Sequence, residues 1–146
     1  MDTSLTPQQI ADAVATGMMA KDRASQGLGL RVTHISPGRA TLVMTVRDDM
    51  LNGFDICHGG YLTLLADSAF AFACNSYNEL TVASSLGIDF IASARGGDVL
   101  TASAVEVSQK GRTGIYDVTV CDQNGMQVAV FRGRSHRMQG RPVVAL

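Results

Sequence analysis

The sequence lacks the features by which several classes of protein are recognised. No apolar run reaches the roughly 18 residues that a membrane span needs, so we expect no membrane segment. The first residues, Met1 to Leu5, hold no basic stretch followed by an apolar core, and so predict no secretory signal. The three cysteines are widely spaced, which fits free thiols in a reducing compartment better than a disulfide framework. We therefore expect a cytoplasmic protein.

The sequence also lacks an excess of charge of either sign. The formal net charge is -1 and 17% of the residues are charged, which gives no reason to expect binding to nucleic acid or to a membrane surface. The exception is the C-terminal end, which is locally basic through Arg132, Arg134, His136, Arg137 and Arg141. These side chains suit a phosphate-bearing ligand, or they are simply solvated on an edge strand and tail.

Several catalytic motifs are missing. There is no Gly-x-Ser-x-Gly elbow of a serine hydrolase and no Gly-x-x-x-x-Gly-Lys phosphate loop. The three histidines are far apart and none has a ligand at metal-binding spacing, so we expect neither a metal nor another cofactor. Cys57 and His58 are adjacent in the chain, and adjacency does not form a Cys–His catalytic pair.

The 146 residues are enough for a single domain, 1–146, with one core. Thr6-Pro7 and apolar residues at i+4 spacing predict a helix to about Lys21. Alternating residues predict a hairpin at 28–34 and 40–46, and strands at 82–92, 99–107, 114–122 and 126–134, the last two joined by a two-residue turn at Asn124-Gly125. With a helix at 59–75, the order α, ββ, α, ββββ predicts an α+β fold with one antiparallel sheet around one helix.

The helix expected over 59–75 is apolar nearly all round, which predicts that protein covers most of its faces. Asp67 lies in the middle of this run. A carboxylate there is costly to bury unless it is paired, hydrogen-bonded or used in chemistry. Asp67 is therefore either a structural acid, bonded to a neighbour such as Ser68 or to a partner at an interface, or a general base or nucleophile.

His58-Gly59-Gly60 opens the same helix. Glycines at a helix start let a ligand approach the backbone and leave N–H groups uncovered, where they can stabilise an oxyanion. The alternative is that they only form the corner between loop and helix. His58 is either an acid–base group or structural, and Asn52, in the turn Asn52-Gly53, is a candidate for orienting a water or a carbonyl.

Three segments of the chain together resemble the hotdog-fold acyl-CoA thioesterases, most closely the phenylacetate-degradation (PaaI) type. They are Asn52-Gly53, Cys57-His-Gly-Gly60 and Leu65-Ala-Asp67-Ser-Ala-Phe-Ala71. The resemblance extends over about residues 20–137. It implies an antiparallel sheet of five to six strands wrapped around a long central helix, with an N-terminal helix in addition. It also implies subunits paired edge to edge, active sites at the dimer interface and a homotetramer.

By the same resemblance, the protein hydrolyses aryl-acetyl-CoA or hydroxylated phenylacetyl-CoA to the free acid and CoA in aromatic catabolism. Gly59 N–H would bind the thioester carbonyl, Asn52 would position the carbonyl or the water, and Asp67 from the opposite subunit would be the base or nucleophile. The chain departs from the expected pattern at Phe54, where we expect many relatives to have histidine. At this position the resemblance therefore carries over no proton-transfer or ring-hydroxyl contact, and no acyl preference that would depend on one.

Further residues are candidates for contacting an acyl-CoA substrate: His58, Gly60, Ser68, Ser84, Ser85, Gly111, Arg112, Thr113 and Arg134. Within this set the basic side chains would bind the CoA phosphates and the two serines at 84 and 85 would line the acyl side. Two rival functions stay open. One is a hotdog dehydratase or hydratase with His58 as its base, and the other is a non-catalytic acyl-CoA-binding protein, for which Asp67 would be superfluous.

Overall fold

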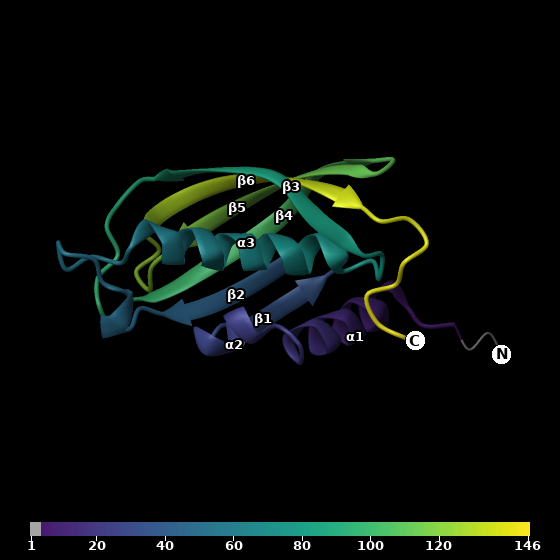
Figure 1. Ribbon diagram of the computed structural model, residues 1–146, viewed down its shortest axis with the longest axis horizontal. Helices are drawn as coiled ribbons and strands as arrows, with labels where there is room; N and C mark the ends of the chain where they lie inside the picture. Colours follow the sequence, from purple (N-terminus) through teal and green to yellow (C-terminus); the bar gives the residue numbers. More distant parts are fainter. Residues whose placement is uncertain (1–3) are drawn as a thin grey trace.

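The computed structural model describes residues 4–146; the first three residues, part of the segment from which we predict no secretory signal, lie outside it. A long helix lies across a six-stranded sheet, and two shorter helices lie beside one edge of the sheet (Figure 1). The elements in chain order are α1 (Pro7–Met19), α2 (Arg23–Gly27), β1 (Arg31–Ser36), β2 (Arg39–Thr45), the 3-10 turn η1 (Asp48–Met50), α3 (Gly59–Asn75), β3 (Thr81–Phe90), β4 (Val99–Lys110), β5 (Thr113–Cys121) and β6 (Gln127–Arg137). None of the helices within residues 4–146 is both long and apolar enough to cross a membrane.

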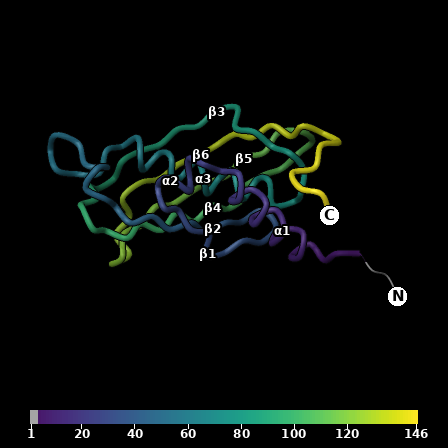
Figure 2. The backbone as a smooth tube through the Cα atoms, turned by 60° about the horizontal axis from the view of Figure 1, so that its bottom comes forward, coloured from purple at the N-terminus to yellow at the C-terminus, as the bar shows by residue number. Residues whose placement is uncertain are grey.

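The sheet is antiparallel throughout and has the strand order β1-β2-β4-β5-β6-β3. Helix α3 packs against the inner face of this sheet, mainly on β2, β4 and β5. The C-terminal segment runs back beside α1 in both views (Figures 1 and 2), where Val144 lies against Gly17. The predicted α+β arrangement, with one sheet around a central helix and a further helix at the N-terminus, is confirmed.

The core lies between α3 and the sheet. The Phe70 ring packs against the rings of Tyr116 and Phe131, with centroids 5.5 and 5.8 Å apart. Gly133 on β6 leaves room for this ring, because a Cβ atom at Gly133 would lie 2.8 Å from it. Close packing of this kind holds α3 firmly in the curve of the sheet and so fixes the direction of every side chain on the helix.

The region between the first helix and the first strand differs from the prediction. A second helix, α2, was not predicted; the Asp22 side chain caps it by accepting a hydrogen bond from Ser25 N–H at 2.9 Å. Leu30 N–H donates to Ser25 O at 3.0 Å, so hydrogen bonding back to this helix continues as far as Leu30. The strand predicted from residue 28 therefore begins at Arg31.

The connection between β5 and β6 is also longer than predicted. Cys121 pairs with Gln127, so the two-residue turn expected at Asn124-Gly125 is wrong. The Asp122 carboxylate accepts hydrogen bonds from the backbone N–H groups of Asn124 and Met126, each at 2.9 Å. This side chain organises a five-residue loop in place of the tight turn.

The two edges of the sheet are covered differently. Helix α1 lies along β1, and Gln8 Nε2 donates to Ile35 O of that strand at 2.7 Å. Among the described residues, strand β3 pairs only with β6, so its outer edge has no partner within 4–146. Val82 and Leu86 on this strand are 48% and 43% exposed. An unpaired edge with exposed apolar side chains is a surface on which another strand can pair.

One buried side chain joins the end of α3 to the start of β3. Asn75 Oδ1 accepts a hydrogen bond from Thr81 N–H at 2.8 Å, and Asn75 Nδ2 donates to Thr81 O and to Ala71 O, each at 2.9 Å. Asn75 is only 4% exposed. The amide therefore replaces water for backbone groups that the fold buries, and it ties the helix to the free edge strand.

Asn75→Ala should lower the free energy of unfolding by about 2 kcal/mol, because it leaves buried backbone groups without partners. Urea unfolding at a fixed protein concentration measures this. Asn124→Ala, in the exposed loop between β5 and β6, is the matched control and should change stability by less than about 0.5 kcal/mol. A loss at Asn75 no larger than that of the control would contradict the bridging role.

Candidate active site

The beginning of α3 presents one free backbone donor. His58 is the N-cap residue, and its Nδ1 accepts a hydrogen bond from Gly60 N–H at 2.9 Å. Tyr61 N–H donates to His58 O at 3.0 Å. Gly59 N–H has no hydrogen-bond partner within residues 4–146. The N–H of Gly60, expected to contact substrate, is thus occupied by its neighbour, while that of Gly59 remains open at the positive end of the helix dipole.

Asn52 lies at the base of the loop that precedes α3. Its Oδ1 accepts hydrogen bonds from the N–H groups of Phe54 and Ile56, at 2.9 and 3.4 Å. Asn52 Nδ2 has no partner in the described part of the chain, so it is a second free donor. Asn52 and Gly59 line the same cavity, of about 360 Å³. Phe54, at the tip of the loop, does not line this cavity and is 84% exposed.

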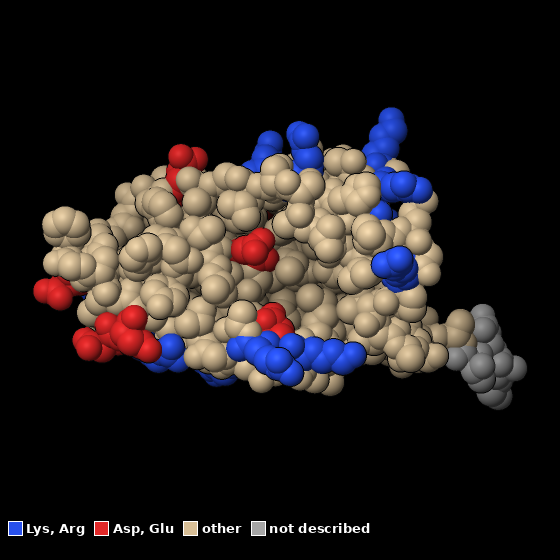
Figure 3. All heavy atoms as spheres, in the orientation of Figure 1, with Lys and Arg blue, Asp and Glu red and all other residues tan. Residues whose placement is uncertain are grey.

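Asp67 is half-buried on α3, away from the sheet, and makes no hydrogen bond or ion pair with any residue from 4 to 146. It is the only acidic residue of this helix, which lies in a broad area with few charges (Figure 3). Burial raises the pKa of the Asp67 carboxyl above its ordinary value. A carboxyl that is desolvated and unpaired holds a proton more tightly than usual and is a stronger base when ionised.

Ser68 is engaged elsewhere. Its Oγ lies 3.1 Å from Ser25 Oγ, whose hydroxyl donates to Asp22 Oδ2 at 2.6 Å. This chain of polar groups connects α3 to α2 and leaves the neighbouring carboxylate of Asp67 without a hydroxyl partner. Sequence reasoning missed the connection, although Asp22 and Ser25, three residues apart, have the spacing of a helix cap.

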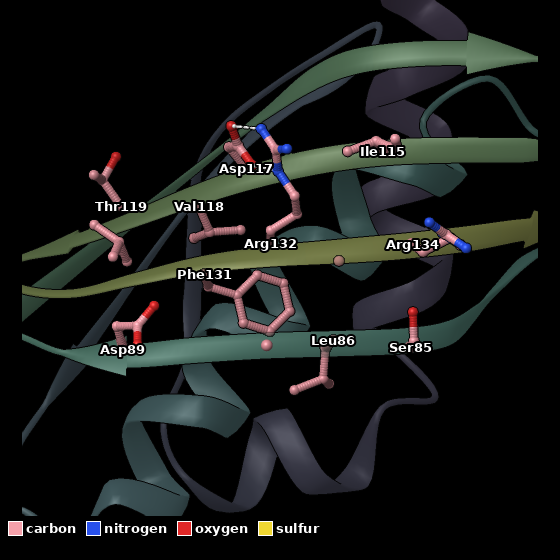
Figure 4. A pocket seen from close by; sticks show the side chains of 13 residues that line it. Ser85, Leu86, Asp89, Ile115, Asp117, Val118, Thr119, Phe131, Arg132 and Arg134 are labelled. Carbon is pink, nitrogen blue, oxygen red and sulfur yellow. Dashed lines mark hydrogen bonds and ion pairs between the residues drawn. The ribbon is translucent and has the colours of Figure 1, made fainter.

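The remaining candidate residues gather at the other end of the sheet. Ser84 Oγ donates to Arg134 O at 3.2 Å, and Ser85 pairs with Arg134 across β3 and β6. Gly111, with φ of +60°, and Arg112 form the turn between β4 and β5, and Thr113 is the first residue of β5. Ser85 and Arg134 line a hollow of about 660 Å³ on the outer face of the sheet (Figure 4).

The basic side chains at this end differ in their partners. Arg132 is held by Asp117 through two hydrogen bonds of 2.7 and 2.9 Å, drawn in Figure 4. Arg112 Nη2 donates to Gln139 Oε1 at 3.3 Å. The Arg134 side chain has no partner within residues 4–146 and is the most available of the three for an anionic ligand.

One subunit does not bring all of these residues together. The turn between β4 and β5 lies at the opposite end of the molecule from the beginning of α3 (Figure 1). Gly59 and Asp67 are eight residues apart on one helix, a distance of about 12 Å along its axis. A group held by Gly59 is therefore out of reach of the Asp67 of the same chain.

The cavity beside Gly59 contains residues that the sequence did not single out. Phe90 and Ile91, from the end of β3, and Ile56 form most of its apolar wall. Cys57 also lines it, but burial raises the pKa of the thiol to about 11, so it is a packing group rather than a nucleophile. Within residues 4–146, no group of three or more His, Cys, Asp or Glu side chains is placed to hold a metal ion.

Comparison with known proteins decides the family. The pattern of the family described as "Thioesterase superfamily" matches residues 54–129. The acyl-coenzyme A thioesterase PaaI of Escherichia coli K12 is 44% identical over 126 residues, which is 86% of this chain and 90% of that protein. The chain belongs to the thioesterase superfamily. The fold described above is accordingly the hotdog fold, and the resemblance to the PaaI type is confirmed.

Solved structures of other superfamily members agree. The structure of the E. coli PaaI protein from the phenylacetic acid degradation operon has a TM-score of 0.91 and 42% identity, covering 93% of this chain and 99% of that one. A mutant of the phenylacetic acid degradation protein PaaI from Thermus thermophilus has a TM-score of 0.77 and 40% identity, covering 80% and 100%. A Streptococcus mutans protein, solved bound to acetyl-CoA, has a TM-score of 0.74 and 25% identity, covering 77% and 90%.

Asp67→Asn should make this thioesterase more stable at neutral pH. Because the pKa of Asp67 is higher in the folded than in the unfolded chain, ionising this carboxyl costs folding free energy. The cost is absent below the unfolded pKa of about 3.9, grows as the pH rises and is complete above the folded pKa. Thermal unfolding should therefore give a higher Tm for Asp67→Asn than for wild type at pH 7, with the difference vanishing in acid.

Asp117→Asn is the matched control for this measurement. Hydrogen bonds from Arg132 lower the pKa of Asp117, so its ionised form stabilises the folded chain at neutral pH. Removing that charge should lower the Tm at pH 7. If Asp67→Asn were no more stable than wild type at pH 7, Asp67 would have a compensating partner in solution.

Proposed function

We propose that the protein hydrolyses acyl-CoA thioesters to the free acid and CoA, with phenylacetyl-CoA and hydroxylated phenylacetyl-CoA as the substrate class, in aromatic catabolism. The observation that carries the proposal is Asp67, a half-buried carboxylate that no other residue from 4 to 146 pairs with. The choice of substrate is supported by the similar E. coli protein, an acyl-coenzyme A thioesterase from the phenylacetic acid degradation operon. The whole of residues 1–146 acts as one domain, in the cytoplasm.

The thioester carbonyl binds at the beginning of α3. Gly59 N–H and Asn52 Nδ2 lie beside the cavity and have no partner within residues 4–146, and the carbonyl oxygen accepts from Gly59. As negative charge develops on this oxygen, the donors and the helix dipole stabilise it without having to reorganise. Asn52 orients the carbonyl or the attacking water, since its Oδ1 is already fixed by the loop.

The carboxylate that attacks comes from a second subunit. The free edge of β3, with its exposed apolar side chains, pairs with the same edge of another copy in a two-fold arrangement. Such pairing lays the two α3 helices side by side in opposite directions. The Asp67 of one subunit then approaches the Gly59 of the other. Two such pairs assemble into a homotetramer.

Two chemical routes agree with this geometry. In the first, Asp67 removes a proton from water, the water oxygen bonds to the carbonyl carbon, and the C–S bond breaks to release CoA. In the second, the Asp67 oxygen itself bonds to the carbonyl carbon and displaces CoA, leaving a mixed anhydride that water then hydrolyses. In both routes the thiolate of CoA takes up the proton that water loses.

The CoA moiety extends toward the opposite end of the partner subunit. Two-fold pairing brings the beginning of one α3 near the β4–β5 turn end of the other chain, which holds Gly111, Arg112 and Thr113. Arg134, whose side chain has no partner within residues 4–146, binds a phosphate together with Arg112. Ser84 and Ser85, beside Arg134 on the paired strands β3 and β6, line the acyl side of the substrate.

The rival functions are less well supported. A dehydratase would need His58 to face the substrate as a base, whereas His58 Nδ1 caps α3 by accepting the N–H of Gly60. A protein that only binds acyl-CoA would have no use for an unpaired carboxylate that destabilises the fold at neutral pH.

A free-thiol assay over a panel of acyl-CoAs tests the function directly. Wild type should release thiol from phenylacetyl-CoA, with kcat/KM falling in acid at a pH above the ordinary pKa of aspartate, because the Asp67 carboxyl must be ionised. Asp67→Asn should lower kcat about 100- to 10,000-fold while substrate binding persists. His58→Ala is the discriminating comparison: if it abolished turnover while Asp67→Asn retained it, the dehydratase-type chemistry would be favoured instead.

A further inference from the structure

The cavity beside Gly59 is suited to one part of the substrate. Apart from Asn52, Gly59 and Ser93, its lining is apolar. The pantetheine arm of CoA carries two amides that need hydrogen-bond partners, whereas a hydrocarbon acyl group needs none. A volume of about 360 Å³ is at the small end of ligand cavities and fits an acyl group rather than a whole acyl-CoA. The acyl group, held by its carbonyl at Gly59, therefore lies in this cavity.

Phe90 forms the wall of the cavity nearest to the carbonyl site. A Cβ atom built on Gly59 would lie 2.8 Å from Phe90 Cζ and 3.2 Å from both Cε atoms, so the tip of the ring points directly at this glycine. The loop before α3, the beginning of α3 and the end of β3 meet at this end of the molecule (Figure 1). No other aromatic side chain from the described part of the chain lines the cavity.

The backbone of Phe90 is fixed, but packing leaves part of its ring exposed. Phe90 pairs with Ala129 across β3 and β6, and the next residue, Ile91, donates its N–H to Val128 O at 2.9 Å. The backbone is therefore held on both sides of the ring. Yet 53% of the residue is exposed, so the ring has a free surface that a ligand can cover.

We propose that Phe90 is the residue that selects aromatic over aliphatic acyl groups. With the thioester carbonyl bound at Gly59, the Phe90 ring lies beside the carbonyl carbon. The aryl group of phenylacetyl-CoA, one methylene from that carbon, then meets the Phe90 ring edge to face or in an offset stack. An alkyl chain in the same place buries area but gains no such ring contact. This inference rests on the proposed thioesterase function and adds a residue that determines its specificity.

The test compares kcat/KM for phenylacetyl-CoA and hexanoyl-CoA, measured by thiol release. Phe90→Leu keeps an apolar side chain but removes the ring, and should lower the ratio of the two values about tenfold, chiefly through phenylacetyl-CoA. Phe90→Tyr keeps the ring and should keep the ratio. Phe54→Leu, the same replacement at an aromatic residue that does not line the cavity, is the matched control and should leave the ratio unchanged.

The outcomes separate this inference from the function on which it rests. If wild type releases no thiol from any acyl-CoA, the proposed function fails. If wild type is active and Phe90→Leu lowers both values equally, Phe90 contacts the CoA arm and the inference is overturned. It is also overturned if Phe54→Leu changes the ratio and Phe90→Leu does not. Retained hydrolysis of hexanoyl-CoA shows that Phe90→Leu folds. If Phe90→Leu does not fold, the β-branched variant Phe90→Ile replaces it and should show the same tenfold fall in the ratio relative to wild type.

Discussion

The distance between Gly59 and Asp67 is the constraint on which the account of this protein depends. Both residues lie on α3, eight positions apart, so about 12 Å of helix separates them. A nucleophile must come within about 3–3.5 Å of the carbon that it attacks. Because α3 is a rigid helix packed into the sheet, no local motion closes this gap. The free donor and the free acid of one subunit can serve one reaction only if they face the complementary groups of another copy.

The rest of the fold supports a site in which Gly59 of one subunit lies near Asp67 of another. Helix α1 covers the β1 edge of the sheet, whereas the β3 edge is open and carries exposed apolar side chains. Asn75 anchors the start of β3 to the end of α3, so the free edge and the helix keep one relative position. Within residues 4–146 no side chain is paired with Asp67, and its raised pKa is a cost to folding, as expected of a group kept for its chemistry rather than for stability.

Much of this could be predicted from the sequence, because the strongest patterns are local. The apolar run with Asp67 predicted α3, and alternation predicted the sheet strands to within a few residues at most ends. The failures have physical causes. Helix α2 depends on one capping side chain, Asp22, in a segment without periodicity, and the loop after β5 depends on Asp122. Phe90 belongs to the site only because β3 ends beside Gly59, a contact between residues 31 positions apart that no local pattern reports.

Hybrid oligomers give the most direct test of a site shared between subunits. Gly59→Pro removes the N–H at the first helical position, where the backbone of His58 suits a residue before proline. Its ring also displaces Phe90, whose Cζ would lie 2.8 Å from a Cβ atom at this position, so the whole Gly59 side of the site is disabled. Thiol release is measured for two doubly tagged hybrids: Gly59→Pro paired with Asp67→Asn, and wild type paired with a chain carrying both changes. The account predicts that the first hybrid regains about half of the wild-type activity, since one of its two sites is intact, and that the second is inactive. Activity in the second hybrid and none in the first would show that each chain holds a complete site, which would contradict it.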